Sequence, residues 1–457
     1  MSLGSLLSIA QSALAAQQRA MEVTGHNVAN ANTPGYSRQT LQIQAATPLQ
    51  MPMFSMGRGV EATTITRSRD AFYDQSYRTD NGQLGLSTTT NGYLSQIQSA
   101  LNEPSTTGLS SALDGMFSAF SDLSSDPANS TNRQAVVAAA SRVVSQLHSL
   151  STQLTSTMRD AQSNLSVQVG TVNGLVSKIA DLNDQIVASN GPGGPSSDLM
   201  DQRDNLIDQL SNYMDVRTTT NSDGSVSVLA GDVTLVSGPA STSLAMVAVG
   251  SGYGIAPAGG GPVLDAGSGS IKSLASLTQD KLPSLQAGLD QIASSLVTQF
   301  NTLHESGYTL TGATGVDFFD PTRTNASNID LSAAVKSSTD NIAASATGDA
   351  GNGGIASQLA GFATTGVAAL GGNTFREQFV SLASGVGIDV NNSQNDMDSQ
   401  QTLVARDDQA RTSVSGVSVD EEMVNLISQQ QAYQAAARIV TVADQMVQSL
   451  LTLTTTA

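Results

Sequence analysis

The sequence feature that most constrains the fold is a long run, residues 131–188, in which apolar side chains recur at helical spacing. They are Val136, Val137, Val143, Val144, Leu147, Leu150, Leu154, Met158, Leu165, Val169, Val172, Val176, Ile179, Leu182 and Ile186. Steps of three, four and seven residues place such side chains on one side of an α-helix. At about 1.5 Å per residue this helix would extend for several tens of ångströms, well beyond a usual globular helix. The run therefore predicts an elongated, mainly α protein with a rod-like bundle of long helices.

Both ends of the chain carry a heptad-like pattern of apolar residues. The N-terminal pattern is Leu3, Leu7, Ala10, Leu14, Met21 and Val28, with Gln17 and Thr24 in the remaining positions. The C-terminal pattern is Met423, Leu426, Tyr433, Ala437, Val440, Val447 and Leu451, interrupted by Gln430 and Asp444. Such patterns most often form an ordinary intramolecular core, but these lie at the chain ends and are broken by polar residues. We expect the two terminal helices to pair in a coiled-coil-like manner and to act as a polymerisation seam, in which the polar residues either set the register or face water.

The N-terminal helix is expected to end in a turn. The turn residues are Asn30, Asn32, Thr33, Pro34, Gly35 and Tyr36. The asparagine side chains compete for backbone hydrogen bonds, and the residue before a proline disfavours helical geometry. The Pro-Gly pair suits the two central positions of a type II turn. At the other end of the chain, Ser418 and Glu421 have the spacing of a capping box and predict the start of the last helix.

The segments between the terminal helices alternate in type. Residues 39–66 are predicted to be a strand or extended arm, because apolar and polar residues alternate and prolines exclude a helix. Helices are expected over 70–100, 109–123, 197–214, 271–304 and 374–412, with a glycine-proline stop at 191–195. Gly82, Gly85 and Gly92 suggest kinks or breaks in the first of these, and residues 388–390 an interruption in the last. Residues 307–372 are rich in loops and resist assignment.

A small β module is expected on the outside of the helices. Residues 216–220, 226–229 and 233–236 have strand-like patterns, and a glycine-rich flank follows at 250–261. The predicted domains are a terminal helical polymerisation domain with its extended arm (1–66 plus 416–457), a rod-like domain (67–214 plus 270–415) and the outer β module (215–269).

Composition narrows the possible partners. The chain has 20 Lys and Arg against 38 Asp and Glu, a formal net charge of −18, which argues against nucleic acid or an anionic membrane as a partner. The sequence has no cysteine, so it can form neither a disulfide nor a thiolate metal site. It shows no secretory signal and no apolar run long enough for a membrane span. Charged residues make up only 13%, and such a neutral, polar surface suits dense packing of identical copies.

No set of residues predicts catalysis, a cofactor or a metal. His26, His148 and His304 are isolated in the sequence. Residues 389–400 resemble a calcium loop but lack its glycine and its final glutamate, and residues 267–273 lack the glycine that a phosphate loop needs before its lysine. Asp201, Asp204, Asp317 and Asp320 could supply the acid and base of a glycosidase, although the sequence gives no reason to pair them.

Two terminal blocks carry a family resemblance. Residues 17–39, which run from Gln17 through Thr33-Pro34-Gly35 to Gln39, resemble the N-terminal signature of bacterial flagellar axial proteins, that is, rod, hook and hook-associated proteins. Residues 416–423, 430–438 and 443–446 resemble the C-terminal signature of the same family. The ending Tyr36-Ser37-Arg38-Gln39 looks most like the hook-associated protein 1 group.

The resemblance implies a structural subunit, not an enzyme, at the junction of hook and filament. It implies self-assembly into a ring or tube, with the hook protein and a second junction protein as neighbours and an export chaperone on the C-terminal helix. It also implies export through the flagellar type III apparatus without a cleaved signal peptide, to an extracellular place on the flagellum. The alternatives are a hook or rod subunit, which should be richer in strands, and a secreted enzyme acting on the cell wall.

Overall fold

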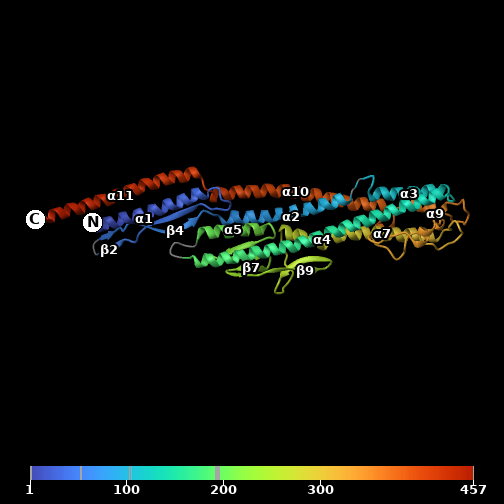
Figure 1. Ribbon diagram of the computed structural model, residues 1–457, viewed down its shortest axis with the longest axis horizontal. Coiled ribbons are helices and arrows are strands. Elements are labelled where there is room, and N and C mark those ends of the chain that lie inside the picture. The colour runs from blue at the N-terminus through green and yellow to red at the C-terminus, as the bar shows by residue number, and fades with distance from the viewer. Residues whose placement is uncertain (1–2, 52–53, 102, 104, 191–195, 456–457) are drawn as a thin grey trace.

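The computed structural model describes residues 3–51, 54–101, 103, 105–190 and 196–455, and shows an elongated, mainly helical molecule (Figure 1). Both ends of the chain lie at the same tip, and the chain reverses at the opposite, distal end (Figure 1). No helix in the described part of the chain is both long and apolar enough to cross a membrane.

The tip consists of two helices and an arm of strands. Helix α1 (Leu3–Asn30) runs antiparallel beside α11 (Val419–Thr455), which confirms the predicted pairing (Figure 1). Strand β1 (Gln39–Ala45) pairs antiparallel with β4 (Val60–Arg67), and β2 (Leu49–Met51) pairs with β3 (Phe54–Met56). This β arm packs along α1, where the Val60 N–H donates to Ser12 Oγ at 3.3 Å.

The rod is built from helices of 8 to 59 residues. They are α2 (Ala71–Leu101), α3 (Leu109–Ser125), α4 (Ser130–Ala188), α5 (Ser197–Ser211), α6 (Gly269–Ser276), α7 (Leu282–Glu305) and α10 (Phe375–Ser415), with a π-turn over Leu277–Lys281. The 59 residues of α4 confirm the long helical run, and the Asn129 side chain caps its first turn. The predicted stop at 191–195 lies outside the described residues.

Two predicted breaks in the rod were wrong. Helix α10 is continuous through residues 388–390, because Val386 is buried and Val390 packs beside the same cluster, and this packing outweighs local propensity. Helix α2 is continuous through its three glycines. At two of them, the missing side chain lets another segment of the chain approach the helix closely. A Cβ on Gly85 would lie 2.2 Å from the Asn212 carbonyl oxygen, and one on Gly82 would lie 2.4 Å from Ser268 Oγ.

The inserted β region lies along one side of α4 (Figure 1). One sheet has the order β5 (Arg217–Thr220), β6 (Val226–Ala230), β7 (Val233–Ser237) and β8 (Ala240–Ser241), and a hairpin joins β9 (Leu244–Val249) to β10 (Gly252–Pro257). The glycine-rich stretch predicted as a flank therefore contributes a strand. These strands share a hydrophobic cluster with α4, α5 and α6, to which Val172, Ile207, Val228 and Ile271 belong.

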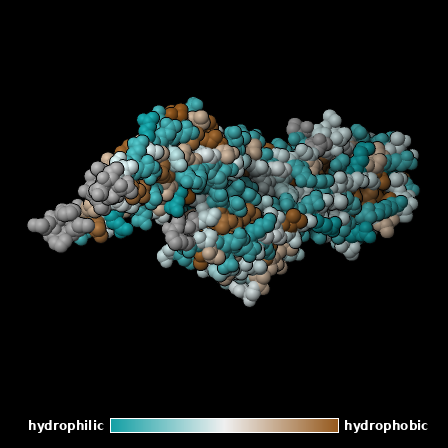
Figure 2. All heavy atoms as spheres, turned by 60° about the vertical axis from the view of Figure 1, so that its left-hand side comes forward, coloured by the Kyte–Doolittle hydropathy of each residue, from teal (hydrophilic) through white to brown (hydrophobic). Residues whose placement is uncertain are grey.

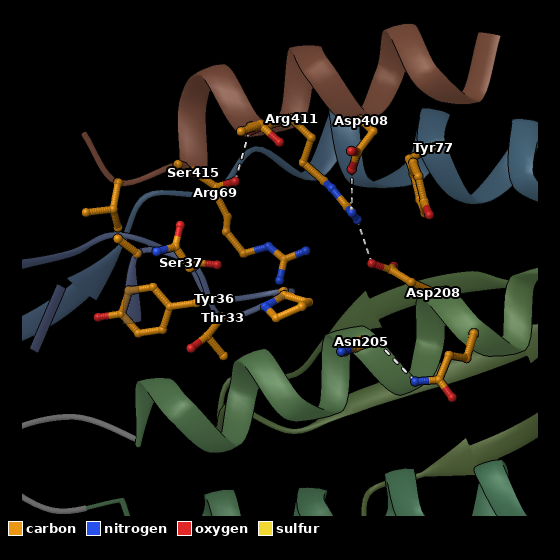
Figure 3. A pocket seen from close by; sticks show the side chains of 18 of the residues that line it. Thr33, Tyr36, Ser37, Arg69, Tyr77, Asn205, Asp208, Asp408, Arg411 and Ser415 are labelled. Atoms are coloured by element: carbon orange, nitrogen blue, oxygen red, sulfur yellow. Dashed lines mark hydrogen bonds and ion pairs between the residues drawn. The ribbon is translucent and has the colours of Figure 1, made fainter. Parts of the chain in front are cut away.

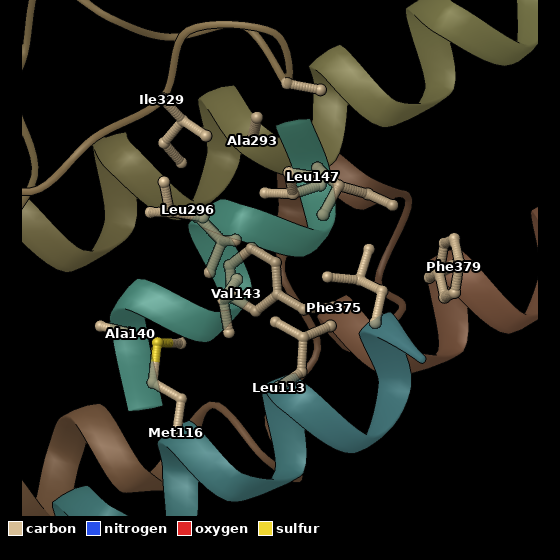
Figure 4. Close-up of a cluster of buried hydrophobic side chains, with 14 of the residues drawn as sticks. Leu113, Met116, Ala140, Val143, Leu147, Ala293, Leu296, Ile329, Phe375 and Phe379 are labelled. Atoms are coloured by element: carbon tan, nitrogen blue, oxygen red, sulfur yellow. The ribbon is translucent and has the colours of Figure 1, made fainter. Parts of the chain in front are cut away.

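A second hydrophobic cluster fills the distal end. Leu113, Val143, Leu296 and Phe375 converge there from α3, α4, α7 and α10 (Figure 4). The region 307–372 folds over this cluster through α8 (Ala333–Ser337), α9 (Gly354–Gly361) and two 3-10 turns (Thr339–Asn341 and Ala368–Leu370). Its packing depends on phenylalanines such as Phe318 and Phe319, whose positions follow no helical or strand period in the sequence.

Candidate assembly surface

The buried side chains of α1 and α11 are mostly small or polar. On α1 the buried residues are Ala10, Ala16, Ala20, Val23, Thr24 and Asn27, and on α11 they are Glu422, Ala436 and Ala443. Gln429 Nε2 donates to Thr24 Oγ1 at 3.1 Å, and Asn27 Nδ2 donates to Glu422 at 3.2 Å. The two helices therefore approach closely but bury few large apolar groups against each other.

The large apolar residues of the predicted seam lie beside this contact. We call the following set the outer stripe: Leu7, Leu14, Met21 and Val28 on α1, and Met423, Leu426, Tyr433, Ala437, Val440, Val447 and Leu451 on α11. Every member is half-buried or exposed, and Leu451 is 58% exposed. The side chain of Leu3 lies outside the described residues. Of the interrupting residues, Gln430 and Asp444 are exposed and Gln17 is half-buried.

Helical geometry places both halves of the outer stripe on one side of the pair. Four of its members directly follow a buried residue: Met21, Val28, Met423 and Ala437. One residue turns a helix by about 100°. In antiparallel helices this turn carries both sets toward the same side. Figure 2 shows apolar side chains exposed on this terminal part of the molecule.

The turn after α1 is held by one buried side chain. Asn27 Nδ2 donates to the Gln39 carbonyl and Asn27 Oδ1 accepts from the Gln39 N–H, both at 2.9 Å, as a paired strand would. The Tyr36 hydroxyl donates to Asn27 Oδ1 at 2.8 Å. The Tyr36 N–H donates to the Thr33 carbonyl at 3.1 Å, and Gly35 has φ +79°, which confirms the predicted turn. Burial and the nearby carboxylates of Asp198, Asp201 and Glu422 raise the pKa of Tyr36, so its hydroxyl stays a donor.

A row of carboxylates on α5 receives the chain after this turn. Asp198, Asp201, Asp204 and Asp208 recur at steps of three and four residues and share one helix face. The Gln39 amide donates to Asp198 at 2.7 Å, and Ser37 donates to Asp201 through its N–H (2.9 Å) and its hydroxyl (2.8 Å).

Arginines neutralise the middle of this row. Arg67 reaches Asp201 at 2.7 Å and Asp204 at 2.9 Å, and Arg69 reaches Asp204 at 3.2 Å. Burial alone would raise the pKa of Asp204, but Arg67, Arg69 and Arg203 outweigh it and hold the pKa below its usual value. We call this network, from Ser37 to Asp208, the joint, because it ties the terminal helices and β arm to the rod.

The end of α10 and the start of α11 also contact the joint. Arg411 of α10 pairs with Asp208 and lies 4.1 Å from the centre of the Tyr77 ring (Figure 3). Arg38 donates to Glu422 at 2.8 Å, and its N–H donates to the Ser415 carbonyl at 2.8 Å. A polar cleft of about 610 Å³ opens between the turn, α5 and the end of α10 (Figure 3).

The start of α11 follows Ser418, as predicted. The Glu421 N–H lies 3.4 Å from Ser418 Oγ, a long contact, and the Glu421 carboxylate lies 3.4 Å from Arg38. Glu421 thus faces the joint as well as the helix terminus.

The structure gives the candidate catalytic residues structural roles. Asp201 and Asp204 are tied to arginines, whereas Asp317 and Asp320 lie in the loop after α7, so the four do not form one site. His26 contacts Asp198 at 3.2 Å, and His148 and His304 contact backbone carbonyls. Asp389 pairs with Lys281. Among the described residues, no group of three or more His, Asp or Glu side chains is placed to hold a metal ion.

Family models match three parts of the chain. Residues 94–319 match the flagellar hook-associated protein FlgK helical domain. Residues 7–36 match the flagella basal body rod protein, and residues 408–453 match the C-terminal region of the flagellar basal body rod FlgEFG protein. Flagellar hook-associated protein 1 of Bacillus subtilis (strain 168) is 30% identical over 492 residues, covering 97% of each chain. This chain belongs to the flagellar hook-associated protein 1 family.

Other family members align over less of their length. Flagellar hook-associated protein 1 of Salmonella typhimurium is 30% identical over 69% of this chain and 59% of its own. The Escherichia coli (strain K12) protein is 28% identical over 69% of this chain and 60% of its own. A solved structure of the flagellar hook junction protein FlgK from Burkholderia pseudomallei superposes with a TM-score of 0.67 at 16% identity, over 75% of this chain and all of that one. That match shows a shared fold. The family consists of structural proteins of the flagellum.

Proposed function

We propose that this chain is a subunit of the junction between the flagellar hook and filament, and that it polymerises with its own copies through the outer stripe. The observation that carries the proposal is the division of side chains on α1 and α11. The buried residues of both helices are mostly small or polar, whereas large apolar residues remain exposed. An exposed apolar surface of this extent marks an interaction site. A second copy, which brings the same surface, can cover it.

Family membership supports further parts of the proposal, namely where the protein works, what it contacts and how it is exported. The work of the protein is assembly without catalysis, outside the cell on the flagellum. Its neighbours are the hook protein and a second junction protein. Before export, a chaperone covers α11, because its exposed Ile427, Val442 and Leu451 would otherwise favour aggregation. The chain is exported without loss of its N-terminal helix.

The test places two negative charges on the outer stripe. Val447→Asp and Leu451→Asp, combined, remove two apolar side chains of which each contributes about 2 kcal/mol when buried at an interface. The double variant should keep the helix content of the monomer, because both side chains are exposed. It should lose assembly in sedimentation velocity and leave hooks without filaments in a strain that lacks the native gene.

A matched control adds the same charge elsewhere. Ser163→Asp and Ser166→Asp lie on the exposed face of α4 and should assemble as the unmodified protein does. Normal assembly of the Val447→Asp, Leu451→Asp variant would refute a role for the outer stripe.

A further inference from the structure

The contact between α10 and α2 changes character along its length. The α10 residues that face the rod recur every seven positions: Phe379, Val386, Ser393, Gln400 and Asp407. The series begins with apolar side chains at the distal end and becomes polar toward the joint. Helix α2 follows the same trend, since Leu94 and Ile97 are buried distally whereas Asp74 and Arg78 are buried near the joint. Hydrophobic burial therefore holds the distal half of α10 and fades toward Ser415.

Two buried acceptors lie in the polar half. Among the described residues, neither Gln400 Oε1 nor Asp407 Oδ2 has a hydrogen-bond donor. Asp407 is 5% exposed, and its other oxygen accepts from Arg406 of the same helix at 3.0 Å. The free-energy penalty of a buried acceptor without a donor is large enough to change the equilibrium between a packed and an open state about tenfold.

Asp407 also faces a like charge. Asp80 of α2 lies against it, and burial together with the Asp407 carboxylate raises the pKa of Asp80. The charged groups around the pair are Arg406 and Asp408, the two neighbours of Asp407 in α10, and Arg411, one turn nearer the joint. When both carboxylates are ionised they repel each other, and a protonated Asp80 would supply the donor that Asp407 Oδ2 lacks.

We propose that the joint-side half of α10, residues 393–415, opens from α2 as a separate unit while residues 375–390 remain packed, and that it carries α11 away from α1 when it opens. The Arg411 contacts with Asp208 and Tyr77 oppose this opening. Gly416, which follows α10, links the opening unit to α11. This device concerns the equilibrium of the monomer and stands independently of the proposed assembly role.

Hydrogen exchange of the full-length monomer tests the proposal. At neutral pH, amides in 393–415 should exchange at least about tenfold faster than those in 375–386, after correction for intrinsic rates. Asp80→Asn removes one charge and can donate to Asp407 Oδ2. It should slow exchange in 393–415 about fivefold, the factor expected for two unit charges near contact even at the dielectric constant of water.

The control is Asp396→Asn, which makes the same charge change on the exposed face of α10 and should leave the exchange rate unchanged. Because protonation of Asp80 should replace the repulsion with a hydrogen bond, lowering the pH should slow exchange in the unmodified protein but not in Asp80→Asn. Gln400→Leu removes the second buried acceptor that lacks a donor, and it should also slow exchange in 393–415. This variant tests the proposal if Asp80→Asn fails to fold. Equal protection along the whole of α10, or equal effects of Asp80→Asn and Asp396→Asn, would overturn the proposal.

Discussion

His304 makes the distal cluster sensitive to acid. Its ring lies between two backbone groups: Nε2 is 2.8 Å from the Ala343 nitrogen, and Nδ1 contacts the Val316 carbonyl. The amide can only donate and the carbonyl can only accept, so the ring is neutral with its proton on Nδ1. Burial lowers the pKa of His304 from 6.5 to about 4. Protonation would remove the acceptor for Ala343 and bury a charge.

The sign and size of the pH effect follow from linkage. Between the two pKa values the unfolded chain binds a proton that the folded protein does not, so stability falls as the pH falls below 6.5. The free energy of unfolding should drop by about 2 kcal/mol between roughly pH 7.5 and pH 5 from this group alone. Above about pH 7.5 the contribution is complete.

Guanidinium unfolding followed by circular dichroism at both pH values measures this drop. Replacement of the ring by an amide in His304→Gln should lower stability at both pH values but remove this part of the pH dependence. Leu296→Ala, which weakens the same cluster without a titrating group, should retain it. Equal pH-dependent losses in His304→Gln and in the unmodified protein would refute the reasoning.

Two further predictions concern close packing and the joint. Gly85→Ala should destabilise the protein by about 1 to 3 kcal/mol because its Cβ would meet the Asn212 carbonyl. Gly92→Ala, where the new Cβ enters open space, should stabilise the protein by up to about 1 kcal/mol. Thermal melting compares the two variants. Asp201→Ala should cost about 1 to 3 kcal/mol because it removes the acceptor of both Ser37 donors and one of the two carboxylates that Arg67 contacts. Asp198→Ala, at a half-exposed carboxylate, should cost about 1 kcal/mol or less. Hydrogen exchange in 37–67 reports the difference, and equal effects would contradict it.

The sequence predicted those helices and turns that are determined by residues close to one another in the chain. The helix over 131–188 follows from its apolar periodicity, and the turn at Thr33–Tyr36 follows from the fixed geometry of proline and the freedom of glycine. The glycines of α2 misled because their role is set by Asn212 and Ser268, which lie far away in the sequence. The same limit applies to the joint. The spacing of the carboxylates on α5 is visible in the sequence, but their partners Arg67 and Arg69 are more than a hundred positions away.

The terminal helices show a different limit. A heptad pattern of the largest apolar residues predicts that these residues face the partner helix. In the structure, alanines such as Ala20 and Ala436 are buried, whereas the large residues are half-buried or exposed. The apolar residues of a sequence include those that make contacts within one subunit and those that make contacts between subunits. Periodicity alone does not distinguish the two.

The nature of the contacts changes in steps from the distal end to the tip. Phenylalanines bury the distal cluster, ion pairs hold the joint, and alanines with polar partners hold α1 to α11. Each step replaces apolar burial by contacts that contribute less net stability, since charged pairs must give up their hydration. Local opening should therefore be easiest at the tip, where apolar side chains remain exposed. A subunit with this order can keep a folded rod while its termini exchange the contacts of the monomer for those of the assembly.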